Sequence, residues 1–457
     1  MADIAGRRVL VISNEQVAAR MAGPAIRALN LARQLHARGA TVTLATPRAP
    51  EGLWDELDGL EVATFGTPSG RAFRRLAAAH DVVVSQPQRV DVLSALAASG
   101  ARLVFDLYVP SFVERIAQLG TEPGDDQLKR RLLERDRLEY ATALQLGDAF
   151  ICASERQRDH WLGALGQAGR LDLDLLDRDP RADALVGVVP FGIADDAPAP
   201  LSPEAPGAIR GTLAPADSIV LLWTGGLWNW FDPVVVVEGL ARARETEPRL
   251  RLVVMGMHHP EAHWEEQDAS RRMRERAEEL GLLAGDDPGV VLCDQWIPYL
   301  ERHRYLLDAD IAVSAHHDTL ETRFSFRTRF LDHLWSGLPT LTTPGGDLAD
   351  AMVANGAALP VAEGDAEAWH AALLKVAGDA DLRAQMSVAA RDLAGEYRWS
   401  SIVEPLASLV ADNAPTTPRG RIGRAAWLRY AWLLVRIRIQ AKGLGSLASA
   451  LRGASGR

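Results

Sequence analysis

Two series of strand-like and helix-like segments constrain this chain more than any other feature. Short apolar runs rich in Val, Ile and Leu alternate with longer segments whose apolar residues recur at helical spacing. Strands that alternate with helices predict parallel sheets covered by helices on both faces. We expect strands at 8–13, 40–46, 81–85, 101–107, 148–153 and 185–190, and again at 218–224, 250–256, 290–293, 310–314, 339–343 and 358–361.

A proline-rich stretch, "DDAPAPLSPEAPGAIRG", separates the two series. Such a composition is typical of a linker or hinge. A chain of 457 residues is also too long for one ordinary core. We therefore expect a first domain at 1–197, a linker at 198–207 and a second domain at 208–398.

Charge and cysteine content exclude several classes of protein. Residues 414–457 hold eight arginines, one lysine and no acid, so their formal charge is +9. Because the net charge of the whole chain is −10, residues 1–413 carry −19. An acidic body argues against general nucleic-acid binding. Cys152 and Cys293 lie in apolar runs, which indicates buried free thiols. Without a signal peptide or a spanning apolar run, we expect a cytoplasmic protein.

One stretch of the second half, "ADIAVSAHHDTLETRFSFRTRFLDHLWSGLPTLTTPGG", resembles the signature of the GT-B glycosyltransferases of the retaining group 1, family 4 type. In that family an EGFGxxxxE segment follows a strand and precedes GxP. Gly337-Leu338-Pro339 matches GxP, and Asp332 lies where the second glutamate binds the ribose hydroxyls. An aspartate can accept the same hydrogen bonds with shorter reach.

The same stretch also departs from the family pattern. Phe324 stands in place of the first glutamate, and Ser325 and Arg327 replace the two glycines. Glu321 is nearby but out of register. This chain therefore lacks the glutamate to which the resemblance assigns the sugar contact.

Further segments extend the resemblance over most of residues 8–413. They are "GPAIRALNLARQLHARGATVTLAT", "VVPFGI", "VVMGMHHP" and "RWSSIVEPL". The resemblance implies an α/β GT-B fold, in which two Rossmann-like doubly wound domains face each other across a cleft. It also implies that a helix at 399–413 crosses back to the first domain, which leaves a basic helical tail at 414–457.

In the family, a loop of the form GRLxxxKG holds the donor diphosphate with its Arg and Lys. The matching loop here, "TGGLWNWFDP", lacks both cations. A diphosphate leaving group still needs cations or many N–H donors. We expect Arg327 to supply the catalytic charge, with Arg329 as the weaker candidate. The candidate donor-binding residues are Gly225, Gly226, Trp228, Asn229, Trp296, His316, Ser325, Arg329 and Asp332.

The aromatic residues and histidines leave alternatives open. Trp228, Trp230 and Trp296 can form walls of the donor crevice or pack in the core. No metal-ligand spacing such as HExxH occurs in "HHPEAHWEE" or "AHHD", and the family is metal-independent. We expect no metal and no cofactor beyond the nucleotide-diphosphate sugar.

Three residues are candidates on the acceptor side. Asp106 follows a strand, at a position where many relatives have a histidine, and is either a catalytic base or a structural carboxylate. Gln86 follows the strand at 81–85. Gly23 precedes the predicted helix at 24–37, whose free N–H groups can approach a ligand.

The tail predicts an amphipathic helix at 424–442. Trp427, Tyr430, Leu433, Leu434 and Ile437 share one uncharged arc. Residues 421–442 are thus a candidate contact with an anionic membrane surface, on the inner face of the plasma membrane. The alternative is docking of the tail on the acidic body.

Together these features predict a metal-independent hexosyltransferase. We expect transfer of a sugar, with retention, from a nucleotide-diphosphate sugar to the hydroxyl of a lipid-linked or glycan acceptor in cell-envelope polysaccharide or glycolipid synthesis. The alternative is a non-catalytic GT-B-like sugar-binding or scaffold partner of an envelope-assembly complex. A GT-B sugar-nucleotide epimerase is a third hypothesis.

Overall fold

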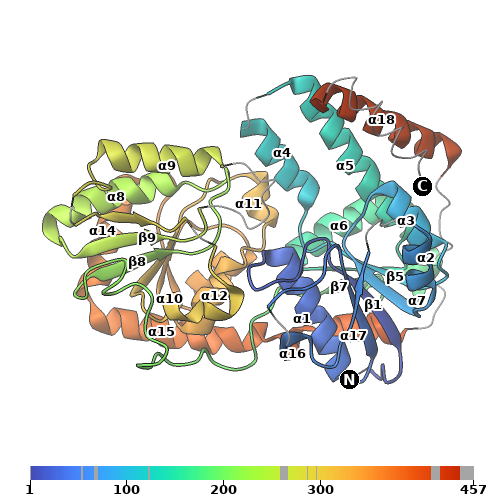
Figure 1. Ribbon diagram of the computed structural model, residues 1–457, viewed down its shortest axis with the longest axis horizontal. Helices are drawn as coiled ribbons and strands as arrows, with labels where there is room; N and C mark the ends of the chain where they lie inside the picture. Colours follow the sequence, from blue (N-terminus) through green and yellow to red (C-terminus); the bar gives the residue numbers. More distant parts are fainter. Residues whose placement is uncertain are drawn as a thin grey trace.

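The computed structural model describes residues 2–52, 55–65, 70–121, 124–257, 266–285, 287–294, 296–412 and 423–442. Two α/β domains lie side by side, each built on one parallel sheet (Figure 1). The predicted alternation of strands and helices is confirmed, because each apolar run forms a strand whose ends lie within two residues of the expected ones.

The first sheet has seven strands in the order β3-β2-β1-β4-β5-β6-β7, and every pairing is parallel. The sequence did not predict β3. Its residues, "EVAT", are polar and mostly exposed at the sheet edge, so no apolar run marks them. The strands are β1 (Arg8–Ile12), β2 (Thr41–Thr46), β3 (Glu61–Thr64), β4 (Val82–Ser85), β5 (Arg102–Asp106), β6 (Ala149–Cys152) and β7 (Val186–Val188).

The second sheet has six parallel strands in the order β10-β9-β8-β11-β12-β13. In both sheets the order reverses direction, between β1 and β4 and between β8 and β11. Ligands of doubly wound sheets bind at such switch points, beyond the carboxyl ends of the strands. The strands are β8 (Ile219–Trp223), β9 (Leu250–Val254), β10 (Val290–Leu292), β11 (Ile311–Ser314), β12 (Thr340–Thr342) and β13 (Ala358–Pro360).

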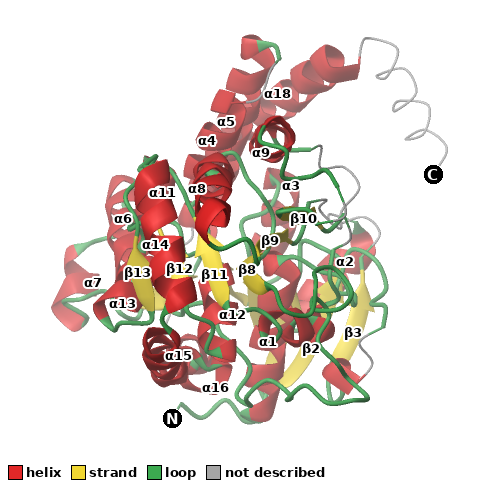
Figure 2. Ribbon diagram, turned by 90° about the vertical axis from the view of Figure 1, so that its left-hand side faces the viewer, coloured by secondary structure: helices red, strands yellow, loops and turns green. Residues whose placement is uncertain are grey.

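Helices cover both faces of each sheet (Figures 1 and 2). The first domain carries α1 (Gly23–Ala37), α2 (Arg71–Ala78), α3 (Val90–Ala97), α4 (Ser111–Thr121), α5 (Asp126–Leu146), α6 (Glu155–Gln167) and α7 (Leu173–Arg178). The second carries α8 (Pro233–Thr246), α9 (Asp268–Glu279), α10 (His303–Leu306), α11 (Leu320–Phe324), α12 (Arg329–Ser336), α13 (Asp347–Ala354), α14 (Ala366–Gly378) and α15 (Ala380–Ala394).

Two short helices, α16 (Trp399–Ile402) and α17 (Glu404–Ala411), return from the second domain to the first. Trp399 is buried against Phe191, with ring centroids 5.2 Å apart. Arg102 of β5 donates to the carboxylate of Asp412 at 3.0 Å. The end of the body therefore ties the two domains together.

The tail helix α18 (Arg424–Lys442) lies along α5 of the first domain (Figures 1 and 2). Arg429 donates to Glu134 at 3.0 Å, and Tyr430 and Leu433 are buried. The predicted apolar arc is divided, because Trp427 remains 45% exposed. The helix α18 is thus docked on the acidic body, as the alternative hypothesis expected. Among the described residues, no helix is long and apolar enough to span a bilayer.

Candidate functional site

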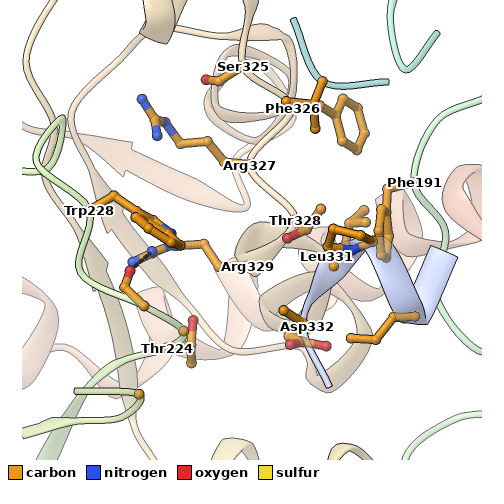
Figure 3. A pocket seen from close by; sticks show the side chains of 18 of the residues that line it. Phe191, Thr224, Trp228, Ser325, Phe326, Arg327, Thr328, Arg329, Leu331 and Asp332 are labelled. Atoms are coloured by element: carbon orange, nitrogen blue, oxygen red, sulfur yellow. Dashed lines mark hydrogen bonds between the residues drawn. The ribbon is translucent and has the colours of Figure 1, made fainter. Parts of the chain in front are cut away.

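A cleft of about 500 Å³ lies between the two domains. Loops that follow β8 and β11 form its wall on the second domain, and loops that follow β4 and β5 contribute the opposite wall. Figure 3 shows Phe191 of the first domain facing Thr328, Leu331 and Asp332 of the second across this space. The cleft therefore lies at the switch points of both sheets.

Two glycine turns pack against each other in the wall of the cleft. Gly225 (φ +70°) follows β8, and Gly256 (φ +72°) follows β9. A Cβ atom on Gly256 would lie 3.0 Å from the carbonyl carbon of Gly225. Glycine satisfies both the left-handed backbone and this close approach. The predicted donor residues Gly225 and Gly226 both line the cleft.

The two tryptophans of the β8 loop stack on each other. The ring centroids of Trp228 and Trp230 lie 5.5 Å apart at an interplanar angle of 16°. Both line the cleft and also pack against the core of the second domain. The structure thus combines the two interpretations, because the pair is anchored in the core and presents aromatic surface to the cavity.

Arg329 projects from the start of α12 into the same wall, beside Trp228 (Figure 3). Its Nη2 donates to the carbonyl of Gly226 at 2.6 Å, and its guanidinium lies 4.0 Å from the ring of Phe231. Nη1 is buried and has no acceptor among the described residues. Burial, followed by the charge of Arg327, lowers the Arg329 pKa to about 9.

Arg327 lies next to it, with its side chain 4% exposed. Its Nη2 donates to Oε2 of Glu321 at 3.0 Å and to the hydroxyl of Thr322 at 2.9 Å. Within the described part of the chain, Nε has no acceptor. Two neighbouring guanidinium groups, each with an unsatisfied buried N–H group, therefore line the cleft.

Glu321 is a cleft residue that the motif comparison left out of register. The structure buries it and places its carboxylate against Arg327. Burial raises the Glu321 pKa, while Arg327 acts in the opposite direction. In "TLETRF", Glu321 follows the helix cap Thr319 and lies in the first turn of a short helix. That position is the sequence feature that could have indicated Glu321 as a site residue.

Glu114 reaches the cleft from α4 of the first domain. Burial, and then the neighbouring charge of Glu321, raises the Glu114 pKa to about 8. This residue was not predicted, because its helical position resembles any solvated glutamate. Two carboxyl groups thus face this region, one from each domain.

Asp332 lines the cleft as predicted, and its carboxylate is held by Arg302. Nε of Arg302 donates to Oδ1 at 2.9 Å. The Arg302 guanidinium lies between the rings of Tyr299, at 3.8 Å, and Trp335, at 4.4 Å. Sequence reasoning missed Arg302, since two of its partners, Asp332 and Trp335, belong to α12, a separate element. The clamp fixes Asp332 while its side chain remains 31% exposed.

Four other predicted residues also line the cleft. Ser325 belongs to the β11 loop, and its hydroxyl donates to the carbonyl of Thr322 at 3.0 Å. The indole N–H of Trp296 donates to the carbonyl of Met21 at 3.2 Å, so this side chain joins the two domains. Gly23, at the start of α1, and Gln86 form part of the first domain's wall.

The structure holds Asp106, the candidate catalytic base, in a buried ion pair. Arg27 donates to both carboxylate oxygens, at 2.6 Å through Nε and 3.0 Å through Nη2. Both side chains are buried, and Asp106 does not line the interdomain cleft. A carboxylate held on both oxygens by a guanidinium is a structural ion pair, which was the alternative interpretation.

Two predicted donor residues also lie away from the cleft. The amide of Asn229 donates to Thr121 of the first domain at 2.8 Å and accepts from the N–H of Ala269 at 3.1 Å. His316 is fully buried behind the loop, and burial, with the charge of Arg327, lowers its pKa to about 2. Asn229 therefore joins the domains, and His316 is a neutral core residue.

No group of three or more His, Cys, Asp or Glu side chains that could hold a metal ion occurs within the described ranges. His258, His259 and His263 lie outside them.

Comparison with known proteins shows two kinds of relative. The chain is 30% identical over 254 residues to the D-inositol 3-phosphate glycosyltransferase of Saccharomonospora viridis, covering 53% of this chain and 55% of the relative. It is 29% identical over 245 residues to the enzyme of that name from Stackebrandtia nassauensis, covering 52% and 51%. The chain thus spans about half the length of the curated relatives it matches. No family model matches.

The similar solved structures match almost the whole chain. They include the Anabaena protein HepE, solved with UDP and glucose (15% identity, 89% of this chain and 99% of that chain, TM-score 0.62). A glycosyltransferase from Rickettsia africae is 16% identical over 90% and 100%, with TM-score 0.59. WaaG, a glycosyltransferase involved in lipopolysaccharide biosynthesis, is 17% identical over 88% and 99%, with TM-score 0.58. The fold is therefore GT-B, and its resemblance to glycosyltransferases is confirmed.

Proposed function

We propose that this chain transfers a sugar from a nucleotide-diphosphate sugar, bound mainly by the second domain, to a hydroxyl group of an acceptor held by the first. The named relatives are glycosyltransferases, and the structure of HepE was solved with UDP and glucose. The transfer follows the metal-independent, retaining mechanism that the family resemblance implies.

The observation that carries the proposal is the pair of buried cations beside the glycine turns. Arg327 and Arg329 each have one buried N–H group without an acceptor in the described part of the chain. An unsatisfied buried donor is costly, and a charged one more so. A diphosphate would satisfy both donors through charge-assisted hydrogen bonds. The missing Arg and Lys of the family loop are thus replaced from the β11 side.

The chemistry required at this position is stabilisation of a leaving group. As the glycosidic bond to the diphosphate breaks, negative charge increases on the phosphate oxygens. Fixed cations in a water-poor site stabilise that charge without reorganisation. The leaving diphosphate can itself take the acceptor proton, so the transfer needs no base from Asp106. Asp332, fixed by Arg302, would accept from the ribose hydroxyls, as the family resemblance implies.

The test begins with a thermal-shift screen against UDP-, GDP- and dTDP-sugars, followed by assays of nucleotide-diphosphate release. Arg327→Ala should raise the donor Kd by about tenfold or more and lower kcat. Because this change leaves Glu321 buried without its partner, the double variant Glu321→Ala/Arg327→Ala tests the site without an orphaned charge. Arg323→Ala, at an exposed position of α11, is the matched control.

Near-wild-type binding and turnover in both Arg327 variants would refute the role of Arg327. Tight donor binding by the wild-type protein without release of nucleotide diphosphate, tested with a wide panel of acceptors, would favour the non-catalytic sugar-binding partner.

We also propose that the outer face of α18 rests on an anionic membrane surface. Leu428 is 67% exposed and Trp432 57% exposed, while Tyr430 and Leu433 point into the body. The helix carries five basic residues and no acid. Apolar and aromatic residues flanked by cations bind anionic lipid surfaces. This face would place the acceptor side of the cleft near lipid-linked or envelope glycans.

A further inference from the structure

A second, smaller cavity of about 200 Å³ lies within the first domain, beside the cleft. We call it the side pocket. It shares Gln86, Tyr108 and Arg115 with the lining of the cleft, so the two cavities adjoin. Asn14 and Gln86 follow β1 and β4, the strands between which the first sheet reverses its order. The side pocket therefore lies at the position where doubly wound sheets bind ligands.

The charges of the side pocket are already paired. Nε of Arg115 donates to Oδ2 of Asp136 at 3.0 Å, and Nε of Arg135 donates to Oδ1 of the same carboxylate at 2.9 Å. The lining also includes Asp106, which Arg27 neutralises, and Glu139. Apart from the Arg27–Asp106 pair, the two arginines thus face two carboxylates, Asp136 and Glu139. A phosphate or carboxylate ligand would find each of these cations already paired with a carboxylate.

Amide groups give the pocket its hydrogen-bonding capacity. Nδ2 of Asn14 donates to Oε1 of Gln86 at 3.0 Å, and Gln88 donates to Oδ1 of Asn14. This chain of side-chain amides fixes the orientation of groups that both donate and accept hydrogen bonds. Hydroxyl groups need that combination. The lining therefore fits an uncharged, hydroxylated ring.

The tail helix supports one wall of the side pocket. The hydroxyl of Tyr430 in α18 donates to the carboxylate of Glu139 in α5. Tyr430 is 3% exposed, and burial raises the Glu139 pKa. Glu139 is thus held from outside the pocket by a residue of the tail, whose opposite face carries the exposed Trp432.

We propose that the side pocket binds an uncharged sugar or cyclic-polyol ring of the acceptor, and that Tyr430 is a positioning residue for its Glu139 wall. This proposal rests on the proposed function, because it assigns the acceptor half of the same cleft. Through Tyr430, the helix α18 would then contribute to acceptor recognition in addition to its proposed contact with a membrane surface.

The test uses the full chain saturated with its best nucleotide diphosphate. Methyl α-glucoside and myo-inositol are the neutral probes, with glucose 6-phosphate and inositol phosphate as charged counterparts, and binding is titrated by NMR. We expect at least one neutral probe to bind more tightly than its phosphorylated counterpart. Asn14→Leu, which removes the amide from a residue outside the cleft lining, should weaken that binding by about tenfold. Arg137→Gln, exposed on α5, is the control.

The positioning role has its own readout. Tyr430→Phe should weaken binding of the neutral probe by about threefold to tenfold. The same change should have no effect in a Glu139→Ala background, because a double-mutant cycle isolates the contact between the two residues. A general loss of structure would weaken binding equally in both backgrounds.

Three outcomes would overturn the inference: no neutral probe binds, the phosphorylated probes bind more tightly, or Asn14→Leu leaves neutral-probe binding unchanged. If the wild-type protein binds no nucleotide diphosphate, the proposed function is refuted instead. The two failures are therefore distinguishable.

Discussion

Nη2 of Arg327 lies 3.0 Å from Oε2 of Glu321, and the two side chains are only 4% and 2% exposed in the wall of the cleft. Arg327 stands where the family motif has a glycine. Glu321 lies three positions before Phe324, which replaces the first glutamate of that motif. The ion pair places an anion of the protein against the cation that we propose for the donor diphosphate, so the two anions compete.

Glu321→Gln should therefore tighten binding of a nucleotide diphosphate. The amide oxygen can still accept from Arg327, but it no longer competes as an anion. We expect the Kd to fall by a factor on the order of ten, measured by calorimetry. Glu363→Gln, at a partly exposed carboxylate of the same domain, is the control. Weaker binding in Glu321→Gln would show that Glu321 itself contacts the donor.

Glu114 predicts a pH dependence of stability. Its pKa in the folded protein is about 8, compared with an ordinary value of 4.5, so the folded state binds more protons between these values. Its contribution is fully present below about pH 4.5 and is lost as the pH rises through about 8. Glu114→Gln should therefore raise Tm relative to the wild type increasingly between about pH 5 and 8. A Tm difference that stays constant across this range would contradict the assignment.

We expect substitution of Asp106 to lower the stability of the folded protein rather than to act directly on sugar transfer. Asp106→Ala leaves the buried Arg27 without its carboxylate partner, a change that costs about 3–5 kcal/mol in comparable buried pairs. We expect a lower Tm with unchanged nucleotide binding by the protein that remains folded. An unchanged Tm with a large loss of turnover would restore the catalytic hypothesis.

The glycine turns allow a matched comparison. Gly256 and Gly281 have φ of +72° and +70°, so alanine costs each about 1 kcal/mol of backbone strain. At Gly256 the new Cβ would also meet the backbone of Gly225 at 3.0 Å, whereas at Gly281 it would meet nothing within 4 Å. Gly256→Ala should therefore lower Tm and weaken nucleotide binding more than Gly281→Ala. If Gly256→Ala and Gly281→Ala change Tm and nucleotide binding equally, the close contact between Gly256 and Gly225 has no role in either.

The membrane proposal is tested with vesicles. Full-length protein should sediment with phosphatidylglycerol vesicles and less with phosphatidylcholine vesicles, and added salt should weaken the binding. Leu428→Ala and Trp432→Ala should each reduce binding. Leu173→Ala, at a still more exposed apolar position on α7, should not. Binding that is the same for both lipids would refute an electrostatic contact.

The fold was predictable because hydrophobic periodicity is a local property. The buried strands from "RVLVI" to "AFIC" are continuous apolar runs, and the ends of each were predicted to within one residue. β3 was missed because an exposed edge strand buries little and needs no apolar run. For the tail, the sequence identified the helix but not the face that docks, because that choice depends on α5.

Site residues were predictable only where they directly follow the end of a strand, because that place in the sequence also fixes their place at the edge of the sheet. Gly225, Ser325 and Asp332 follow strand ends, so the carboxyl edge of the sheet brings them to the cleft. Asp106 also follows a strand, but a guanidinium from α1 takes both of its oxygens. Nothing near Asp106 in the sequence indicates Arg27 as its partner.

By itself, then, the sequence determined two parallel-sheet domains and the loops that follow their strands, since each follows from local apolar patterns and strand ends, while the cleft was implied by the family resemblance. Only the tertiary structure decided which charges meet there. Arg327 with Glu321, Arg302 with Asp332, and Tyr430 with Glu139 are pairs whose partners come from different elements. Burial and pairing set the strength and protonation of such groups, and both are defined only when the domains are folded together.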